Sequence, residues 1–206
     1  MEINLIFSIA VLFLSIIVHE VSHGFAALFL GDPTAKYAKR LTLNPISHID
    51  PLGSIIVPIL TSLIPGSFVF GWAKPVPFNP YNLRWKKWGE AFVAFAGPLS
   101  NILIALVASF AFRLSSLGYF DLGAGAGLLL IIVIVNISLA IFNLMPIPPL
   151  DGSKIFFALL PLRFYKIREV LEKHAFLYVL IFIFFIWQFF EPVIPFIFSL
   201  MTGVAL

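Results

Sequence analysis

Four long stretches with almost no charge constrain this sequence more than any other feature. They cover residues 3–30, 91–112, 123–145 and 175–200. An α-helix needs about 20 apolar residues to cross the hydrocarbon core of a bilayer, so each stretch is long enough to span a membrane. The composition agrees, because 61% of the 206 residues are hydrophobic and only 11% are charged. We therefore predict an all-α polytopic membrane protein with four full transmembrane helices, folded as one domain over residues 1–206.

A fifth apolar segment, residues 52–64, is too short to cross the bilayer. At 1.5 Å per residue it reaches about 20 Å, whereas the hydrocarbon core is about 30 Å thick. Pro58 also interrupts it. We expect this segment to be re-entrant or interfacial. The first stretch lacks the basic region and the cleavage site of a signal peptide, so we expect it to be a mature helix.

The basic residues predict the orientation of the chain. Seven of the 13 Lys and Arg residues lie in residues 31–89, and five lie in residues 148–173. Cytoplasmic loops of membrane proteins are enriched in Lys and Arg, so both segments are expected to be cytoplasmic. This preference accounts for the net charge of +3, and we expect no nucleic-acid partner. We predict a multi-pass integral protein of a prokaryotic plasma membrane, with the lipid bilayer as its surroundings.

A possible metal-binding motif lies inside the first apolar stretch. Residues 19–23 read His-Glu-Val-Ser-His, an HExxH motif. Two histidines four residues apart lie on one face of a helix, where both can reach one tetrahedral zinc ion. Glu20 would then lie beside the open metal position as a general base. Ionisable side chains in a membrane span are costly unless they have a function, which favours metal binding by His19 and His23 over a structural polar cluster.

Asp151 is the strongest candidate for a third ligand. The chain contains no cysteine, so any metal must be held by His, Asp or Glu. Asp151 follows the stretch 123–145 in the run NLMPIPPLDG, where prolines break the helix and Gly152 permits a turn. Irregular backbone at membrane depth is tolerated only where it is buried or lines a polar cavity. If residues 52–64 do not cross, His19 and Asp151 lie at the same, cytoplasmic, face.

The HExxH motif and the later NxxPxPxLDG run together resemble the site-2 protease family of intramembrane zinc metalloproteases. The similarity extends from about Val18 to Lys154. The resemblance implies one zinc ion per chain held by His19, His23 and Asp151, and Glu20 as the general base. It also implies that Asn143 engages the substrate. The sequence has no PDZ or cystathionine-synthase-type domain, so it resembles a short form of the family.

Residues 38–45 are a candidate substrate-binding element. Leu41 and Leu43 alternate with polar residues and Pro45 ends the pattern, which is compatible with an exposed edge strand. The site-2 protease family has a small membrane-associated β-hairpin at this place, which implies that Leu41 and Leu43 contact an extended substrate by strand addition. A plain amphipathic loop is the alternative.

Two further residues are less well defined by the sequence. His48 follows this segment and could approach the metal or a substrate carbonyl, although an interfacial position is the simpler interpretation. Gly97 and Asn101 lie in the run AGPLSN, which resembles a family motif; Gly97 would permit close helix packing and Asn101 would hydrogen-bond across the bundle.

The sequence therefore predicts an intramembrane zinc metalloprotease that acts on a membrane protein with a transmembrane segment. Two alternatives stay open. A metal-ion transporter could use the same ligands as a transit site, although transporters usually contain internal repeats and this chain has none. An inactive, zinc-stabilised interaction protein is the other, which the presence of Glu20 disfavours. A short form with few spans also suggests that a homo-oligomer or a partner seals the site.

Overall fold

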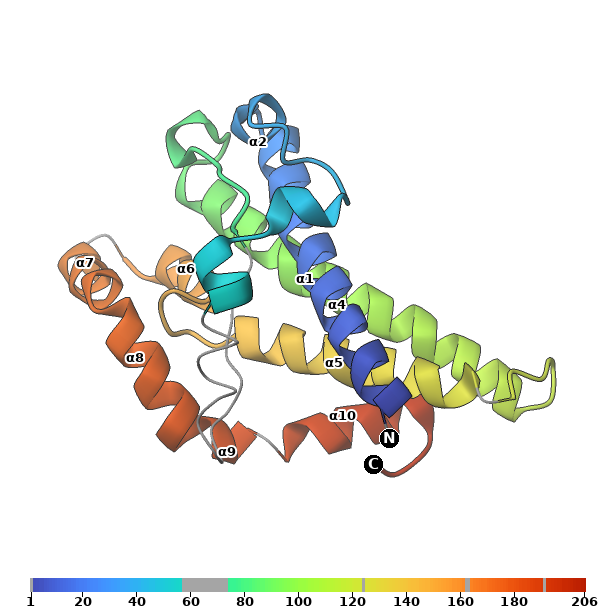
Figure 1. The fold of residues 1–206 in the computed structure, drawn as a ribbon. Coiled ribbons are helices and arrows are strands. Elements are labelled where there is room, and N and C mark those ends of the chain that lie inside the picture. The colour runs from blue at the N-terminus through green and yellow to red at the C-terminus, as the bar shows by residue number, and fades with distance from the viewer. Residues whose placement is uncertain (1, 57–73, 124, 162–163, 191) are drawn as a thin grey trace.

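The computed structural model describes residues 2–56, 74–123, 125–161, 164–190 and 192–206. In these ranges all regular structure is helical and no strand is present (Figure 1). The α-helices are α1 (Glu2–Phe29), α2 (Thr34–Tyr37), α4 (Lys87–Ser116), α5 (Gly125–Asn143), α6 (Asp151–Leu159), α7 (Tyr165–Lys173), α8 (Ala175–Ile181), α9 (Trp187–Phe190) and α10 (Val193–Thr202). Short 3₁₀ helices cover Pro45–His48 and Pro80–Asn82, and π-helical turns cover Pro51–Ile56 and Phe182–Ile186.

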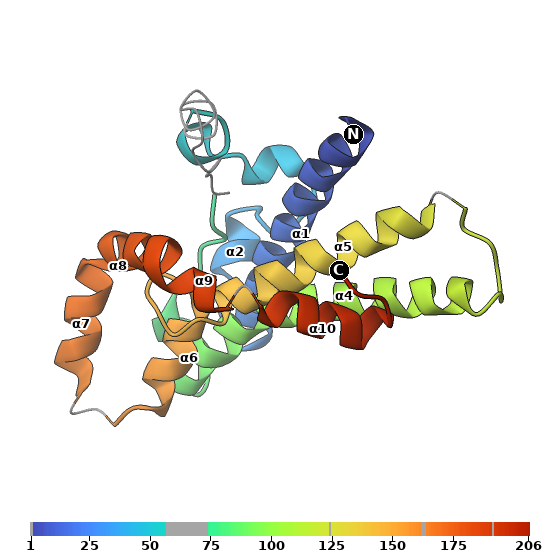
Figure 2. The same ribbon diagram turned by 90° about the horizontal axis from the view of Figure 1, so that it is seen from below.

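Helices α1, α4 and α5 form the centre of the molecule. All three are long and apolar enough to cross a membrane. They correspond to the predicted helices 3–30, 91–112 and 123–145, with bounds that differ by only a few residues. In both views α4 and α5 lie side by side and α1 crosses them (Figures 1 and 2). The prediction of an all-helical fold is thus confirmed for the described residues, with three helices that are apolar enough to span a membrane.

A row of small side chains lets α4 approach its neighbours closely. The buried positions of α4 recur every three or four residues, which is the period of one helix face. They are mostly small residues: Gly89, Ala91, Ala94, Gly97, Ala105 and Ala108. Small residues allow helix backbones to come close enough for van der Waals packing, which drives helix association inside a membrane. This close approach brings α4 against α1 at the level of the HExxH motif.

The opposite helix faces expose large apolar side chains. Ile6 on α1 is 70% exposed, and Val107 and Phe110 on α4 are 70% and 64% exposed. A water-soluble protein rarely leaves so much apolar surface uncovered. These faces are suited to contact with lipid tails.

The predicted fourth span, residues 175–200, is not one straight helix. Residues 166–173 and 175–190 form two helical pieces bent by 73° at His174, and α10 follows as a separate short apolar helix. Pro192 precedes α10, and proline cannot donate the backbone hydrogen bond that would continue a helix. The bent pair could act as one span, so a fourth crossing is possible but not confirmed. Helix α10 packs on α4 and α5 through Ile194 and Phe198 (Figure 2).

The predicted β-hairpin is not confirmed. Within the described residues, 38–45 form a turn and an irregular loop. Lys39 has a φ of 55°, which is incompatible with a strand, and Pro45 begins a 3₁₀ helix. Of the predicted re-entrant segment 52–64, residues 52–56 belong to the π-helical turn, and the remainder lies outside the described residues.

Candidate metal centre

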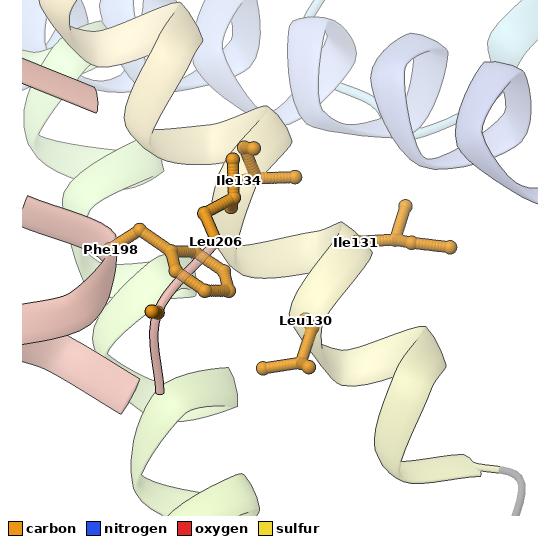
Figure 3. A pocket seen from close by; sticks show the side chains of 6 residues that line it. Leu130, Ile131, Ile134, Phe198 and Leu206 are labelled. Carbon is orange, nitrogen blue, oxygen red and sulfur yellow. The ribbon is translucent and has the colours of Figure 1, made fainter. Parts of the chain in front are cut away.

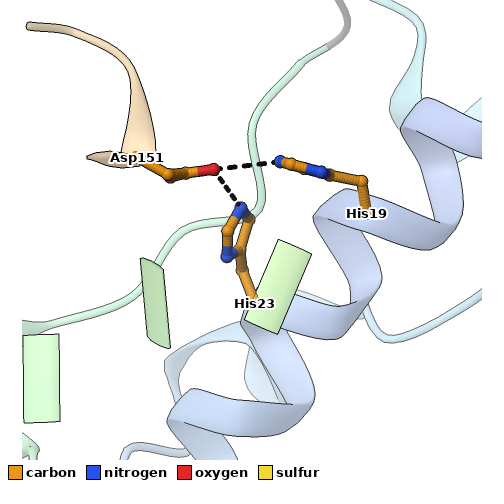
Figure 4. Close-up of side chains that lie close together, drawn as sticks. All are labelled: His19, His23 and Asp151. Carbon is orange, nitrogen blue, oxygen red and sulfur yellow. Dashed lines mark hydrogen bonds and ion pairs between the residues drawn. The ribbon is translucent and has the colours of Figure 1, made fainter. Parts of the chain in front are cut away.

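Three side chains predicted as metal ligands meet in the centre of the molecule. Nε2 of His19 lies 3.0 Å from Oδ2 of Asp151, and Nε2 of His23 lies 3.1 Å from the same oxygen (Figure 4). One ligand atom from each residue lies within 4.8 Å of the others, and all three residues are buried. Ligand atoms bound about 2.0–2.2 Å from a tetrahedral zinc ion are separated by a little over 3 Å. The group therefore has the size of a zinc site.

Two glycines allow these residues to meet. A Cβ at Gly97 would lie 2.5 Å from the His23 ring and 2.6 Å from Nε2 of His19, so only glycine fits where α4 passes the imidazoles. A Cβ at Gly152 would lie 2.1 Å from the Leu144 carbonyl oxygen. Glycine at 152 therefore lets the loop after α5 fold back tightly, and α6 begins with Asp151 directed at the histidines.

The hydrogen bonds of the two rings define their chemistry. Nδ1 of His19 lies 2.6 Å from Oδ1 of Asn101, and Nδ1 of His23 lies 2.7 Å from the Val93 carbonyl oxygen. Because both partners are acceptors, each Nδ1 donates its proton and each Nε2 of a neutral ring carries a lone pair. Two lone pairs then face a carboxylate oxygen, an arrangement that a divalent cation stabilises. The donor set fits zinc, which binds His nitrogen and Asp oxygen.

A buried polar network extends from His19 into three helices. Nδ2 of Asn101 donates to Oδ1 of Asn136 at 2.9 Å, and Nδ2 of Asn136 donates to Oγ of Ser15 at 3.0 Å. Asn101 is on α4, Asn136 on α5 and Ser15 on α1. The first bond turns Oδ1 of Asn101 toward His19. The prediction that Asn101 hydrogen-bonds across the bundle is confirmed, and its partner there is a candidate ligand.

Glu20 is held by an extended segment that follows the undescribed residues. The backbone N–H of Val76 donates to Oε2 of Glu20 at 2.8 Å. The Val76 side chain is buried against α1 near Gly24, where a Cβ would lie 2.8 Å from Cγ1 of Val76. A main-chain donor thus fixes one oxygen of the carboxylate beside the two histidines.

The segment 74–79 is fastened at both ends. At its start, Nη2 of Arg40 donates to the Lys74 carbonyl oxygen at 2.7 Å. At its end, Asp32 accepts hydrogen bonds from the Asn79 backbone at 2.6 Å and the Asn82 side chain at 2.9 Å. Burial acts to raise the pKa of Asp32, but hydrogen bonds from Thr34, Asn82 and Asn79 outweigh it and lower the pKa below its ordinary value.

The residues predicted to bind substrate lie outside the metal group. Asn143 donates from its side chain to the Leu139 carbonyl of its own helix at 3.0 Å. His48 is fully buried, and its Nε2 donates to the Thr42 carbonyl at 2.8 Å, so the structure does not bring it to the metal group. Leu41 packs on Gly24 beside Val76, and Leu43 is 61% exposed.

Four residues that hydrogen-bond in or around the site were not predicted from the sequence: Ser15, Val76, Val93 and Asn136. Asn136 and Ser15 carried a usable signal, because a polar side chain in an apolar span needs a partner, and Ser15 is four residues before His19 on the same helix face. The Val93 carbonyl and the Val76 amide are backbone groups. Only the folded chain shows where such groups lie.

A shallow apolar cavity in the described part of the chain is separate from the metal group. It has a volume of about 280 Å³ and lies between α5, α10 and the C-terminus (Figure 3). Its lining is apolar: Leu130, Ile131, Ile134, Phe198, Ala205 and Leu206. It contains no candidate ligand and no titratable side chain, so it carries no part of the chemistry.

The fold and the donor set together indicate a helical membrane metalloprotein. Comparison with known proteins agrees. The model of peptidase family M50 matches residues 120–187, which include Asp151. The chain is 37% identical over 156 residues to the Bacillus subtilis protein named "Putative zinc metalloprotease YwhC". The matched region covers 73% of this chain and 67% of that protein.

Two mycobacterial relatives carry the name "Putative zinc metalloprotease Rip2". The protein of Mycolicibacterium smegmatis is 29% identical over 152 residues, covering 68% of this chain. That of Mycobacterium tuberculosis is 29% identical over 143 residues, covering 67% of this chain. In each case the match spans 51% of the relative, so the chain spans about half the length of these proteins. No solved structure matches.

The chain belongs to peptidase family M50, the site-2 protease family. The resemblance predicted from the HExxH and LDG motifs is confirmed, and with it the class of zinc metalloproteases and zinc as the cofactor. Proteins of this family are membrane proteins, in agreement with the three apolar helices.

Proposed function

We propose that this protein is an intramembrane zinc endopeptidase that hydrolyses peptide bonds in or near transmembrane segments of other membrane proteins. One observation carries the proposal: the buried His19, His23 and Asp151 group and the adjacent Glu20 lie on and beside a helix apolar enough to span the membrane. A catalytic group on a membrane-spanning helix is accessible to a substrate that itself lies in the bilayer.

The proposed roles follow from the donor set. His19, His23 and Asp151 hold one zinc ion per chain, and the Nδ1 hydrogen bonds of the two rings keep both Nε2 atoms directed at it. Bound zinc supplies a Lewis acid and lowers the pKa of water toward neutrality. Glu20 accepts a proton from the attacking water and later delivers it to the leaving amine nitrogen. The Val76 N–H keeps the Glu20 carboxylate oriented for both transfers.

Substrate contacts are proposed at the rim of this group. Asn143 ends α5 just before the loop that leads to Asp151, so a modest side-chain rotation frees its amide for a substrate carbonyl. Leu43 is exposed and can contact substrate, whereas Leu41 supports Val76. His48 has a structural role as long as it stays bonded to Thr42.

The proposed setting is a prokaryotic plasma membrane with the site toward the cytoplasm, since 12 of the 13 basic residues lie in the two segments assigned to that face. Residues 1–206 act as one domain, and a homo-oligomer would cover the sides of a small bundle. Membership of a peptidase family does not favour the transporter or the inactive interaction protein.

The decisive experiment compares the full-length protein with Glu20→Gln in liposomes that contain a labelled membrane-spanning substrate. We expect cleavage to fall by a factor of about 10² to 10⁴ in the variant, because a positioned general base contributes this much. Zinc content, measured by metal analysis, is expected to stay at one ion per chain.

Glu90→Gln is the matched control. Glu90 is also on a spanning helix but pairs with Arg168 at 2.7 Å, so this variant should retain cleavage. Metal-dependent flux across the liposome without cleavage in either form would contradict the proposal and favour a transporter.

A further inference from the structure

The two oxygens of the Asp151 carboxylate have different partners. Oδ2 lies 3.0 Å and 3.1 Å from the two histidine Nε2 atoms. Oδ1 lies 3.7 Å from Nζ of Lys154, which is on the next turn of α6. One oxygen therefore faces the metal group, and the other faces a cation of the chain itself.

The Lys154 ammonium is held from a second side. Its Nζ lies 5.4 Å from the centroid of the Phe78 ring, within the range of a cation–π interaction. Its side chain is 29% exposed, so the interactions with both partners are only partly screened by solvent. Phe78 belongs to the same extended segment whose Val76 amide binds Glu20. Lys154 thus connects Asp151 to the segment that orients the general base.

This arrangement affects how many oxygens Asp151 can give to a metal. A carboxylate can bind zinc through one oxygen or through both, and a catalytic site needs three protein ligands with the fourth position left for water. An ammonium group on Oδ1 competes with the metal for that oxygen. It therefore favours binding through Oδ2 alone.

We propose that Lys154 is a positioning residue that keeps Asp151 monodentate and so keeps the fourth metal position open. This inference rests on the proposed zinc site. It adds a function for a residue that is not itself a ligand. Without Lys154, the second carboxylate oxygen would bind the metal as an additional ligand, which would raise the coordination number above four and crowd the position of the water.

The test uses the full-length protein loaded with Co²⁺ in place of zinc, because the visible absorption of cobalt is intense in four-coordinate sites and weak in sites of higher coordination. We expect Lys154→Met to lose most of this intensity and Lys154→Arg to keep it. Peptidase activity with zinc should fall by a factor of about 10 to 100 in Lys154→Met, as for other groups that orient ligands, and recover in Lys154→Arg. The matched control is Lys166→Met, because Lys166 is an exposed lysine on α7. This variant should change neither the cobalt spectrum nor the peptidase activity.

Zinc affinity separates this role from a merely structural one. If Lys154 controls the binding mode, Lys154→Met binds zinc at least as tightly as the wild type, because it gains a ligand atom. If Lys154 only supports the fold, zinc affinity falls and the cobalt spectrum of the bound fraction is unchanged. That result would overturn the proposal, as would a variant with a wild-type spectrum and wild-type activity.

Two further variants keep the test decisive. If Lys154→Met does not fold, Phe78→Leu frees the ammonium from its aromatic partner and should reduce the cobalt intensity in part; an unchanged spectrum then overturns the proposal. His23→Ala should abolish the cobalt bands altogether. Bands that persist in His23→Ala would instead refute the proposed metal site, which distinguishes the two failures.

Discussion

At the scale of single residues, Gly97 is the most constrained position of the site. Helix α4 touches both imidazoles at this point, and a methyl group there would lie 2.5 Å from His23 and 2.6 Å from His19. The rings are held against α4 by hydrogen bonds to Asn101 and Val93, which lie one turn on either side of Gly97, so they cannot easily retreat. Substitution must therefore move either α4 or the rings.

We predict that Gly97→Ala removes most of the zinc and the peptidase activity, with a loss of stability of about 1–3 kcal/mol from overpacking. Metal analysis and thermal unfolding of the purified protein check this. Gly127→Ala is the control, because nothing lies within 4 Å of a Cβ at Gly127. A Gly97→Ala protein with a full zinc content would show that the rings have another position available.

Asn101 is the second residue with a specific expected effect. Asn101→Leu removes the acceptor for Nδ1 of His19 and should lower zinc affinity by a factor of about 10 to 100. Asn101→Asp keeps an acceptor at His19 but loses the donor to Asn136, so it should fall between the wild type and Asn101→Leu. Competition with a zinc chelator measures all three affinities; equal affinities for the two variants would contradict the role of this hydrogen bond.

At the scale of elements, Asp32 fastens the end of α1 to the loop before α4. Its carboxylate accepts bonds from Asn79 and Asn82, and these hold the segment that carries the Val76 amide. We predict that Asp32→Asn costs about 1–3 kcal/mol, because an amide nitrogen would face buried donors. Activity should fall as well, since the contact between Val76 and Glu20 depends on this attachment.

The lowered pKa of Asp32 gives this attachment a pH dependence. A carboxyl group whose pKa is lower in the folded state stabilises the fold above its unfolded value of 3.8, and this stabilisation is lost as the pH falls through the lower folded value. Thermal unfolding followed from neutral pH to below 3.8 should therefore show a steeper acid loss for the wild type than for Asp32→Asn. Parallel curves would mean that another group dominates.

At the scale of the whole molecule, the expected orientation can be measured directly because the chain contains no cysteine. Tyr37 and Tyr119 are 78% and 76% exposed and lie beyond opposite ends of the helical bundle. In oriented membranes, Tyr37→Cys should react with a membrane-impermeant thiol reagent only from the cytoplasmic side. Tyr119→Cys should react only from the other side. The reverse pattern would contradict the orientation inferred from the basic residues.

The sequence was sufficient for three of the four predicted spanning helices and for the group of candidate ligands, and insufficient for the fourth span and for the contacts around the site. HExxH spacing places His19 and His23 on one helix face whatever the rest of the fold, and the proline-rich run predicted that Asp151 joins them. The strand expected at residues 38–45 did not form, because a positive φ at Lys39 and the 3₁₀ helix at Pro45 interrupt it. The Val76 amide could not be predicted, since its partner is 56 residues away and main-chain donors carry no sequence signal.

The distance along the chain between the candidate ligands has a mechanical consequence. His19 and Asp151 are 132 residues apart, so a metal bound by both is a cross-link that closes most of the chain into a loop. In a cysteine-free protein, such a link takes the place of a disulfide, which for a loop of this length would restrict the unfolded chain by on the order of 5 kcal/mol. Removing zinc with a chelator should therefore lower the unfolding temperature of the wild type and leave that of His23→Ala unchanged. The ion proposed for hydrolysis would then also link the first helix to the last third of the protein and stabilise the fold.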